Sequence, residues 1–400
     1  MSASPITLRG MTWNHTRGYL PMVATAQRFM ELNPGIEIAW ERRSLKAFEE
    51  FPVEQLAAEY DLIVLDHPFV GYAAAHGPLL PLDAHLPAAF LADQAANSVG
   101  ASHASYTFGG HHWALAIDAA TPVAFWREDL LARHGLTVPQ TWHDLLTLAR
   151  AGHVEIPAAP INCLMNFYSF CIAAGETPFL SPDRVASPDT GRAALADLRA
   201  LLSLCDPHCW SRNPIASHDL VASAGNAQLA YCPLAYGYSN YARDGYAAHR
   251  LTFGEPPLHR GAPLRTTLGG TGLALSALRP HRETALAYAR FAASAEIQRT
   301  LYTAAGGQPG HRSAWIDTAN NQMSGDYFTR TLPVLDRAFL RPRHLGYMEF
   351  QAAAGPVVHA ALRGTLADNE ALAQLDALYR QSLSHSQNPI VKSDHRAPVI

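Results

Sequence analysis

Several apolar runs of this chain end in polar or aromatic side chains, which are therefore candidates for binding or catalysis. They are Trp13, Asn14, His15, Asp66, His67, Tyr236 and Tyr238. In an open α/β sheet the ligand crevice lies beyond the carboxyl ends of the strands, where such side chains collect. Aromatic rings pack on the C–H faces of sugars and polyols, and carboxylates bind hydroxyl groups. These residue types therefore favour a polyhydroxylated ligand.

Each candidate also has a structural alternative. Trp13 can be a core aromatic, one of the two tyrosines can serve packing alone, and Asp66 can cap the following helix. Protonated imidazoles at His15 and His67 would suit an anionic ligand, although a neutral ring is the default near pH 7. The charge of the ligand stays open at this point.

The elements that must position these side chains alternate between strand and helix. Residues 17–32 have apolar positions at helical spacing, and Asn-Pro-Gly at 33–35 ends that helix. Residues 36–40 alternate like a strand, and the unbroken apolar run at 62–65 is typical of a strand buried on both faces of a parallel sheet. This order predicts an α/β fold.

The stretch from 106 to 142 contains the most local signals. Residues 106–108 and 113–117 predict strands joined by Gly109-Gly110, a dipeptide suited to the positive φ of a hairpin turn. Thr141 lies three residues before Asp144, close to the capping-box pattern of a helix start.

The remaining elements follow from the same patterns. The apolar runs at 123–126 and 229–234 predict strands, and residues 128–134, 190–205 and 366–383 predict helices. The chain is long enough to form two medium-sized hydrophobic cores.

Several motifs occur in an order that resembles a known family. They are the strand, helix and strand of residues 6–40, YDLIVLDHPFVGYAAAHGPLLPLDAHL (60–86), the 106–142 stretch, LGGTGLALS (268–276) and GGQPGHRSAW (306–315). Together they resemble the extracellular solute-binding proteins of ABC importers, the family that includes maltose-binding protein.

This resemblance implies a periplasmic-binding-protein-like fold of two α/β lobes joined by a hinge, with a ligand cleft between them. We expect lobe 1 to comprise residues 1–117 and 269–315, and lobe 2 residues 118–268 and 316–400. The chain would cross between the lobes at 117–120 and 268–271, and these crossings would form the hinge.

The resemblance also adds residues to the predicted site. They are Asp118 and Thr121 at the first crossing, Gly269, Gly270 and Thr271 at the second, and Gln308 and Arg312 in the Gly-Gly-Gln-Pro segment. Asp118 is the strongest of them as an acceptor of ligand hydroxyls, and Arg312 has the alternative of a structural ion pair.

Composition limits the partners. The chain has 34 acidic and 30 basic residues without a basic tract, so we expect no nucleic acid partner. The N-terminus MSASPITLRG lacks the pattern of a secretory signal, so a periplasmic location would require a removed leader, and a leaderless relative would be cytoplasmic.

The five cysteines are an odd number. Cys205 and Cys209 flank a turn, and in an oxidising compartment we expect them to form a disulfide, with two buried thiols as the alternative. A zinc site with His208 and His218 is the less favoured alternative, because the spacing matches no common zinc module.

Common enzyme signatures are absent, including the metal-binding His-Glu-x-x-His helix and the Gly-x-Ser-x-Gly elbow. We therefore expect a monomeric, non-enzymatic receptor without a cofactor, which captures a carbohydrate or polyol and delivers it to the transmembrane subunits of an importer. The alternatives are a small carboxylate as the solute and, from another class, a glycoside hydrolase that uses Asp66 and Asp118.

Overall fold

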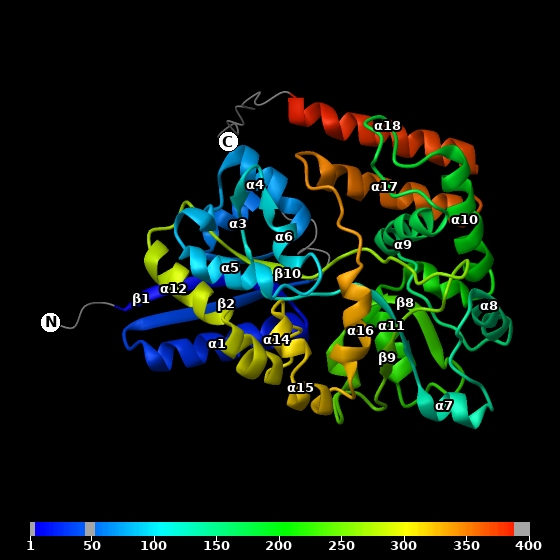
Figure 1. Ribbon diagram of the computed structural model, residues 1–400, viewed down its shortest axis with the longest axis horizontal. Helices are drawn as coiled ribbons and strands as arrows, with labels where there is room; N and C mark the ends of the chain where they lie inside the picture. The colour runs from blue at the N-terminus through cyan, green and yellow to red at the C-terminus, as the bar shows by residue number, and fades with distance from the viewer. Residues whose placement is uncertain (1–4, 45–52, 388–400) are drawn as a thin grey trace, which may run out of the picture.

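The computed structural model describes residues 5–44 and 53–387 and has two lobes, each with its own sheet (Figure 1). The first sheet has the order β2-β1-β3-β10-β6. Its strands are β1 (Ile6–Trp13), β2 (Ile36–Arg43), β3 (Leu62–Asp66), β6 (Leu115–Ala116) and β10 (Thr271–Leu275). β1 runs parallel to β2 and β3, whereas β10 is antiparallel to both β3 and β6. The carboxyl ends of β1 and β3 therefore lie at one edge, next to the start of β10.

Helices surround this first sheet. They are α1 (Thr16–Leu32), α3 (Val53–Glu59), α4 (Val70–His76), α5 (Ala88–Ala96), α6 (Ser102–Ser105) and α12 (Arg282–Ala292). Residues 62–65 of β3 are all buried, as the unbroken apolar run predicts. Side chains of β1, β3, β10, α1 and α12 form one hydrophobic core.

The second sheet is smaller and has the order β8-β7-β9. Its strands are β7 (Pro122–Trp126), β8 (Tyr231–Tyr236) and β9 (Thr252–Gly254). The larger helices of this lobe are α7 (Glu128–Arg133), α8 (Trp142–Arg150), α9 (Pro160–Ala173), α10 (Pro188–Leu202), α11 (Pro214–Ala222), α16 (Tyr327–Asp336), α17 (Tyr347–Leu362) and α18 (Asp368–Gln387). Helices α9, α10, α17 and α18 pack together in a second core, and a third core lies around Phe125, Phe253 and Tyr327.

Short elements complete the two lobes. They are the 3₁₀ turns η1 (His67–Phe69), η2 (Leu82–Ala84), η3 (Pro207–Ser211) and η4 (Ser239–Ala242), the helices α13 (Ala295–Ile297), α14 (Arg312–Trp315) and α15 (Thr318–Met323), and the π-helical η5 (Gln298–Tyr302). Three chain segments meet between the lobes, because Asp118 forms a bridge with Pro309 and Ala120 forms one with Gly269. The boundaries between the lobes in the sequence stay a prediction.

The predicted α/β class is confirmed, and so are several local features. Thr141 and Asp144 form a full capping box at the start of α8. Gly109 and Gly110 have φ values of 61° and 83° in the turn between β4 (Thr107–Phe108) and β5 (His111–His112). These positive angles are those that a tight hairpin requires.

The strand predicted over 113–117 is shorter, Leu115–Ala116, and the prediction that the Gly109-Gly110 turn joins it to residues 106–108 is wrong. A two-residue turn pairs the residues that flank it, so His111 and His112 form the return strand opposite Thr107 and Phe108. Leu115 and Ala116 belong instead to the first sheet, where they pair with β10. The predicted strand at 229–234 is shifted by two residues, to 231–236.

The predicted disulfide is absent, because Cys205 and Cys209 are both free thiols. The thiol of Cys205 instead donates to the Leu201 carbonyl at 3.4 Å. Among residues 5–44 and 53–387, no group of three or more ligating side chains is arranged for a metal ion. Within the same residues, no helix has the length and apolar character needed to cross a membrane.

Candidate ligand-binding cleft

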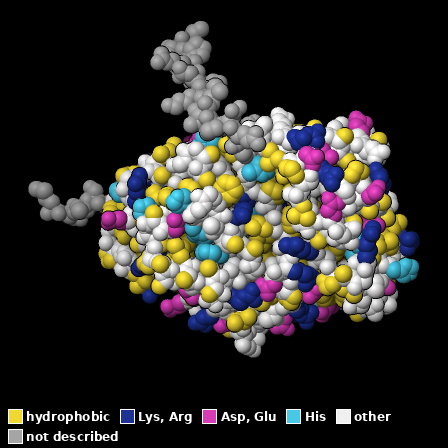
Figure 2. Space-filling view, turned by 45° about the horizontal axis from the view of Figure 1, so that its top comes forward, with side chains coloured by type: hydrophobic (Ala, Val, Ile, Leu, Met, Phe, Trp, Pro, Cys, Tyr) yellow, Lys and Arg dark blue, Asp and Glu magenta, His cyan; other side chains and the backbone are white. Residues whose placement is uncertain are grey.

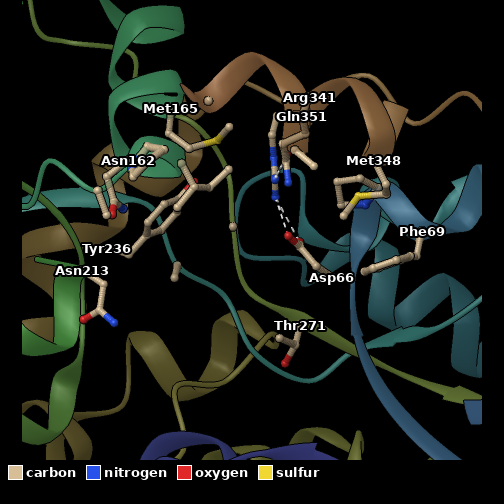
Figure 3. Close-up of a pocket in the computed structure, with 18 of the residues that line it drawn as sticks. Asp66, Phe69, Asn162, Met165, Asn213, Tyr236, Thr271, Arg341, Met348 and Gln351 are labelled. Atoms are coloured by element: carbon tan, nitrogen blue, oxygen red, sulfur yellow. Dashed lines mark hydrogen bonds and ion pairs between the residues drawn. The ribbon is translucent and has the colours of Figure 1, made fainter. Parts of the chain in front are cut away.

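A cleft of about 850 Å³ lies between the two lobes, and residues from both lobes line it. Figure 3 shows Tyr236, Asn162 and Asn213 on one side and Asp66, Phe69 and Met348 on the other. The cleft volume falls within the range of small-molecule sites.

The lobe 1 wall is built where β1 and β3 end. Trp13 is the last residue of β1, and Asp66 is the last residue of β3. Phe69 and Tyr72 follow in η1 and α4 and also line the cleft. The backbone of Gly18 in α1 packs closely against the Trp13 indole. A Cβ at residue 18 would come within 2.3 Å of that ring. The absence of a side chain at Gly18 therefore leaves the space that the Trp13 indole occupies.

The lobe 2 wall combines one strand end with three helix starts. Tyr236 ends β8, Asn162 lies in the first turn of α9, and Asn213 is the N-cap of α11. Gln351 comes from the first turns of α17, whose Met348 lies on the other side of the cleft beside Phe69 (Figure 3). The lobe 2 wall thus presents amides and a phenol.

A buried ion pair joins Arg17 of α1 to Asp118 at the crossing. The Arg17 guanidinium donates from Nε and Nη2 to the two carboxylate oxygens, with an Nε–Oδ1 distance of 2.8 Å. Its Nη1 donates to the Gly237 carbonyl at 2.8 Å, and its carbon lies 4.7 Å from the centre of the Tyr238 ring. Arg17 therefore ties α1, the crossing and the end of β8 together.

Burial and pairing have opposing effects on this ion pair. Burial raises the pKa of Asp118, and the Arg17 guanidinium opposes that rise. Burial also disfavours charged Arg17, but its interaction with Asp118 outweighs this effect and raises the Arg17 pKa. Arg17 is therefore a permanent cation whose charge is compensated by Asp118 within the wall.

A second ion pair spans the cleft from Asp66 to Arg341, which precedes α17. Arg341 Nη2 lies 2.8 Å and 3.0 Å from the two Asp66 oxygens, and its Nη1 donates to Gln351 Oε1 at 2.6 Å. Dashed lines in Figure 3 mark the contact with Asp66. Burial alone would raise the pKa of Asp66, but Arg341 and His67 lower it below its ordinary value. Asp66 is therefore an anion paired across the cleft.

The structure places the predicted site residues in two groups. Seven line the cleft: Trp13, Asp66, Tyr236, Tyr238, Gly269, Gly270 and Thr271. The others are not among its lining residues: Asn14, His15, His67, Asp118, Thr121, Gln308 and Arg312. Of this second group, Asn14 is exposed, and Arg312 pairs with the partly exposed Asp336.

Four residues of the second group support the wall from behind. The Gln308 amide donates to the carbonyls of Ala119 and Gly237 and accepts from Ser239 N–H. Thr121 bonds to Thr266 and Thr267. His15 caps α1 by accepting from Arg17 N–H, and His67 lies 3.1 Å from Asp66.

Both of these histidines are neutral near pH 7. Burial lowers the pKa of His15 to about 3, and the positive charge of Arg17 adds to that effect. Burial also lowers the pKa of His67 to about 4, with a further contribution from Arg341. Neither imidazole therefore brings a positive charge to the cleft.

The two glycines of the return crossing allow close packing at the cleft floor. A Cβ at residue 269 would lie 2.5 Å from the Tyr236 ring. Gly270 has a φ of 99°, and a Cβ there would lie 2.3 Å from the Asp118 carbonyl oxygen. Side chains at these positions would push apart the crossing and the Tyr236 ring.

Several lining residues were not singled out in the sequence. They are Arg17, Asn162, Met165, Asn213, Arg341, Met348 and Gln351. Asn213-Pro214 did carry a signal, since an Asn followed by Pro is typical of a helix start. No comparable pattern marks Arg341, which lies in an irregular segment before α17.

The comparisons with known proteins agree with this architecture. The family model described as bacterial extracellular solute-binding protein matches residues 24–320. Maltose-bound MalE3 of T. maritima superposes with a TM-score of 0.81 at 17% identity, over 94% of this chain and 99% of that one.

Two further solved structures carry polyols. A ribitol complex of an ABC transporter solute-binding protein from Agrobacterium radiobacter K84 has a TM-score of 0.79 at 19% identity, over 94% of this chain and 98% of that one. A D-mannitol complex from Agrobacterium vitis S4 has a TM-score of 0.74 at 17% identity, over 96% and 100% of the two chains. At such identities these likenesses show the shared fold, whereas the family model matches most of the sequence directly. The chain therefore belongs to the bacterial extracellular solute-binding protein family.

Proposed function

We propose that this protein is the receptor of an ABC importer and that it captures a neutral sugar or polyol in the cleft between its lobes. The observation that carries the proposal is the pairing of both cleft arginines with carboxylates, beside aromatic walls. The described residues that line this cleft offer hydrogen bonds and apolar contact without an uncompensated arginine.

The charge pattern favours a neutral solute over a small carboxylate. An anionic ligand would need a cation that is free to pair with it. Arg17 is bound to Asp118 and Arg341 to Asp66, while His15 and His67 are neutral near pH 7. Recruiting either arginine would strand a buried carboxylate, which is costly.

The aromatic side chains supply the apolar contact that a sugar ring or polyol chain requires. Trp13, Tyr236 and Tyr238 line the cleft with Phe69 and Tyr72. The pairings also oppose the glycoside hydrolase alternative, because that chemistry needs a protonated carboxyl and a second carboxylate beside the same bond. Asp66 has a lowered pKa, and Asp118 is held by Arg17 behind the wall.

Membership of the family supports a location outside the cytoplasm, and the titles of the similar structures name maltose, ribitol and D-mannitol as bound solutes. Figure 2 shows acidic and basic side chains mixed over one face of the molecule, without a large area of one sign. We infer that the crossings at 117–120 and 268–271 act as the hinge of closure, and that importer transmembrane subunits receive the closed, solute-bound form.

A thermal-shift screen tests the proposal, since a ligand of the folded state raises its apparent stability. We expect stabilisation by a neutral sugar or polyol from a panel containing maltose, ribitol and D-mannitol, and none by small carboxylates. Tyr236→Ala should weaken calorimetric binding by about 1 to 2 kcal/mol while leaving the fold intact. Trp13→Ala should weaken binding by a similar amount and also lower the melting temperature, because the Trp13 ring belongs to the lobe 1 core. Stabilisation by carboxylates alone, or release of a chromogenic aglycone from a glycoside, would overturn the proposal.

A further inference from the structure

Two asparagines of the lobe 2 wall, Asn162 and Asn213, bring side-chain amides to the lining of the cleft. Asn162 is only 6% exposed, and its Oδ1 is buried without a hydrogen-bond partner in the described part of the chain. A buried amide without partners costs free energy, so such a group in a native protein calls for an explanation. Asn162 also lines the cleft, so a half-turn of its side-chain amide would bring this oxygen within reach of a ligand that supplies the missing partner.

The backbone holds Asn213 next to this amide. Ala159 N–H donates to the Arg212 carbonyl at 3.1 Å, and Asn162 N–H donates to the Ala159 carbonyl at 2.8 Å. The first turn of α9 is thus bonded directly to the residue that precedes Asn213. Figure 3 shows both asparagines on the Tyr236 side of the cleft.

The two amides differ in what they can offer. Asn213 Oδ1 accepts from Ala216 N–H at 2.9 Å and so caps α11, which leaves the Asn213 NH₂ group as a donor toward the cleft. The Asn162 Oδ1 has no hydrogen-bond partner within the described residues, so no bond to this oxygen prevents the side-chain amide from turning about its last torsion to present it to the cleft. The pair then offers one fixed donor and one adjustable acceptor.

A hydroxyl group is the ligand group that satisfies both, because it donates one hydrogen bond and accepts others. A carboxylate oxygen accepts only, and an ammonium donates only. We propose that Asn162 and Asn213 together bind one hydroxyl of the solute and determine specificity for a hydroxyl at that position. This inference rests on the proposed function, and it identifies which groups of the lobe 2 wall recognise the solute.

Paired variants test the inference while preserving the fold. Asn213→Asp keeps the oxygen that caps α11 and removes the NH₂ donor. Asn162→Leu removes both hydrogen-bonding groups at similar size, and Asn162→Asp retains only acceptors. Asn369→Asp, at the start of α18 and outside the cleft lining, controls for the added charge.

The probes are maltose, ribitol and D-mannitol, with the singly deoxygenated analogues of whichever compound the wild type binds. We expect wild-type binding to fall about tenfold for one of these analogues, because the missing hydroxyl leaves the amides unpaired. Asn213→Asp and Asn162→Leu should bind the parent compound about tenfold more weakly and lose the discrimination against that analogue. Asn162→Asp should lose less affinity than Asn162→Leu, and Asn369→Asp should match the wild type.

The outcomes separate the two proposals. A wild type that binds none of the three parent compounds, nor any other neutral sugar or polyol, overturns the proposed function and this inference with it. A wild type that binds one of them while Asn213→Asp and Asn162→Leu bind equally well, with the same preference over the analogue, overturns the role of the two asparagines alone.

Discussion

The two arginine–carboxylate pairs of this protein share their chemistry and differ in their surroundings. At the crossing, the side chains of Arg17 and Asp118 are 5% and 0% exposed. Across the cleft, those of Arg341 and Asp66 are 4% and 21% exposed. The first pair is enclosed by three chain segments, whereas the second has one partner open to the cleft.

This difference decides what each pair contributes. Burial raises the pKa of Asp118, so the carboxylate relies on Arg17 to remain charged. Asp66 instead has a lowered pKa because Arg341 and His67 outweigh its burial. The comparison indicates that the crossing pair holds the architecture together and the cleft pair sets the polarity of the binding surface.

Arg17→Met should have the largest effect. It leaves Asp118 as an uncompensated buried charge, which typically costs about 3 to 5 kcal/mol. Urea unfolding at pH 7 measures the loss. Adding Asp118→Asn should recover part of it because the stranded charge is removed. A loss below about 1 kcal/mol in the single variant would contradict the structural role of this pair.

Gly71→Ala tests how the segment carrying Arg341 is anchored to lobe 1. A Cβ at residue 71 would lie 1.8 Å from the Arg343 carbonyl oxygen, so the backbone must shift. We expect a loss of about 2 to 3 kcal/mol in the free energy of unfolding.

Gly225→Ala is the matched control, because no atom lies within 4 Å of a Cβ at that position. Thermal unfolding of both variants provides the comparison. Equal melting temperatures for the two variants would show that the backbone at Arg343 can move away from a Cβ at residue 71 without a loss of stability.

Asp66→Asn should destabilise the protein by about 1 to 2 kcal/mol at pH 7, less than Arg17→Met, because solvent in the cleft can reach the site. It should also change the pH dependence. The folded pKa of Asp66 lies below the unfolded value of about 3.9. As pH falls, the unfolded chain therefore binds the proton first.

The contribution of this pair is thus complete above about pH 4 and is lost as pH falls toward the folded pKa. Unfolding curves between pH 2 and pH 7 should show a shallower acid decline for Asp66→Asn than for the wild type. If the stability of both proteins fell equally with pH, Asp66 would not be a carboxylate whose protonation destabilises the fold.

Arg312→Gln should have the smallest effect. Its partner Asp336 is partly exposed, so the ion pair contributes about 0 to 1 kcal/mol. Because Arg312 is not among the lining residues, we expect solute affinity to stay within about twofold of the wild type. A large loss of affinity in calorimetry would instead support the original assignment of Arg312 to the site.

Local rules made much of the fold predictable. The apolar run at 62–65, the capping box at Thr141 and the turn at Gly109-Gly110 each depend on a few neighbouring residues. The strand predicted at 113–117 shows the limit of such rules, because Leu115 and Ala116 pair with β10 of the larger sheet and not across the Gly109-Gly110 turn.

The site was less predictable for a related reason. Trp13, Asp66 and Tyr236 follow strand runs, and a general rule for open sheets locates such residues. Asn162 and Gln351 project from helix starts, and Arg341 comes from an irregular segment, so their meeting depends on how distant helices pack. Arg17 has the spacing of an ordinary helical residue, and only Asp118 and Gly237 reveal why it is buried.

The position of β10 has a consequence for biosynthesis. This strand lies between β3 and β6, yet the ribosome produces it only after the entire second sheet. Until then the nascent chain exposes two unpaired strand edges, which are templates for aggregation. Completion of the first sheet must therefore wait for a long-range insertion, and the chain should depend on chaperones during the interval before residues 271–275 emerge.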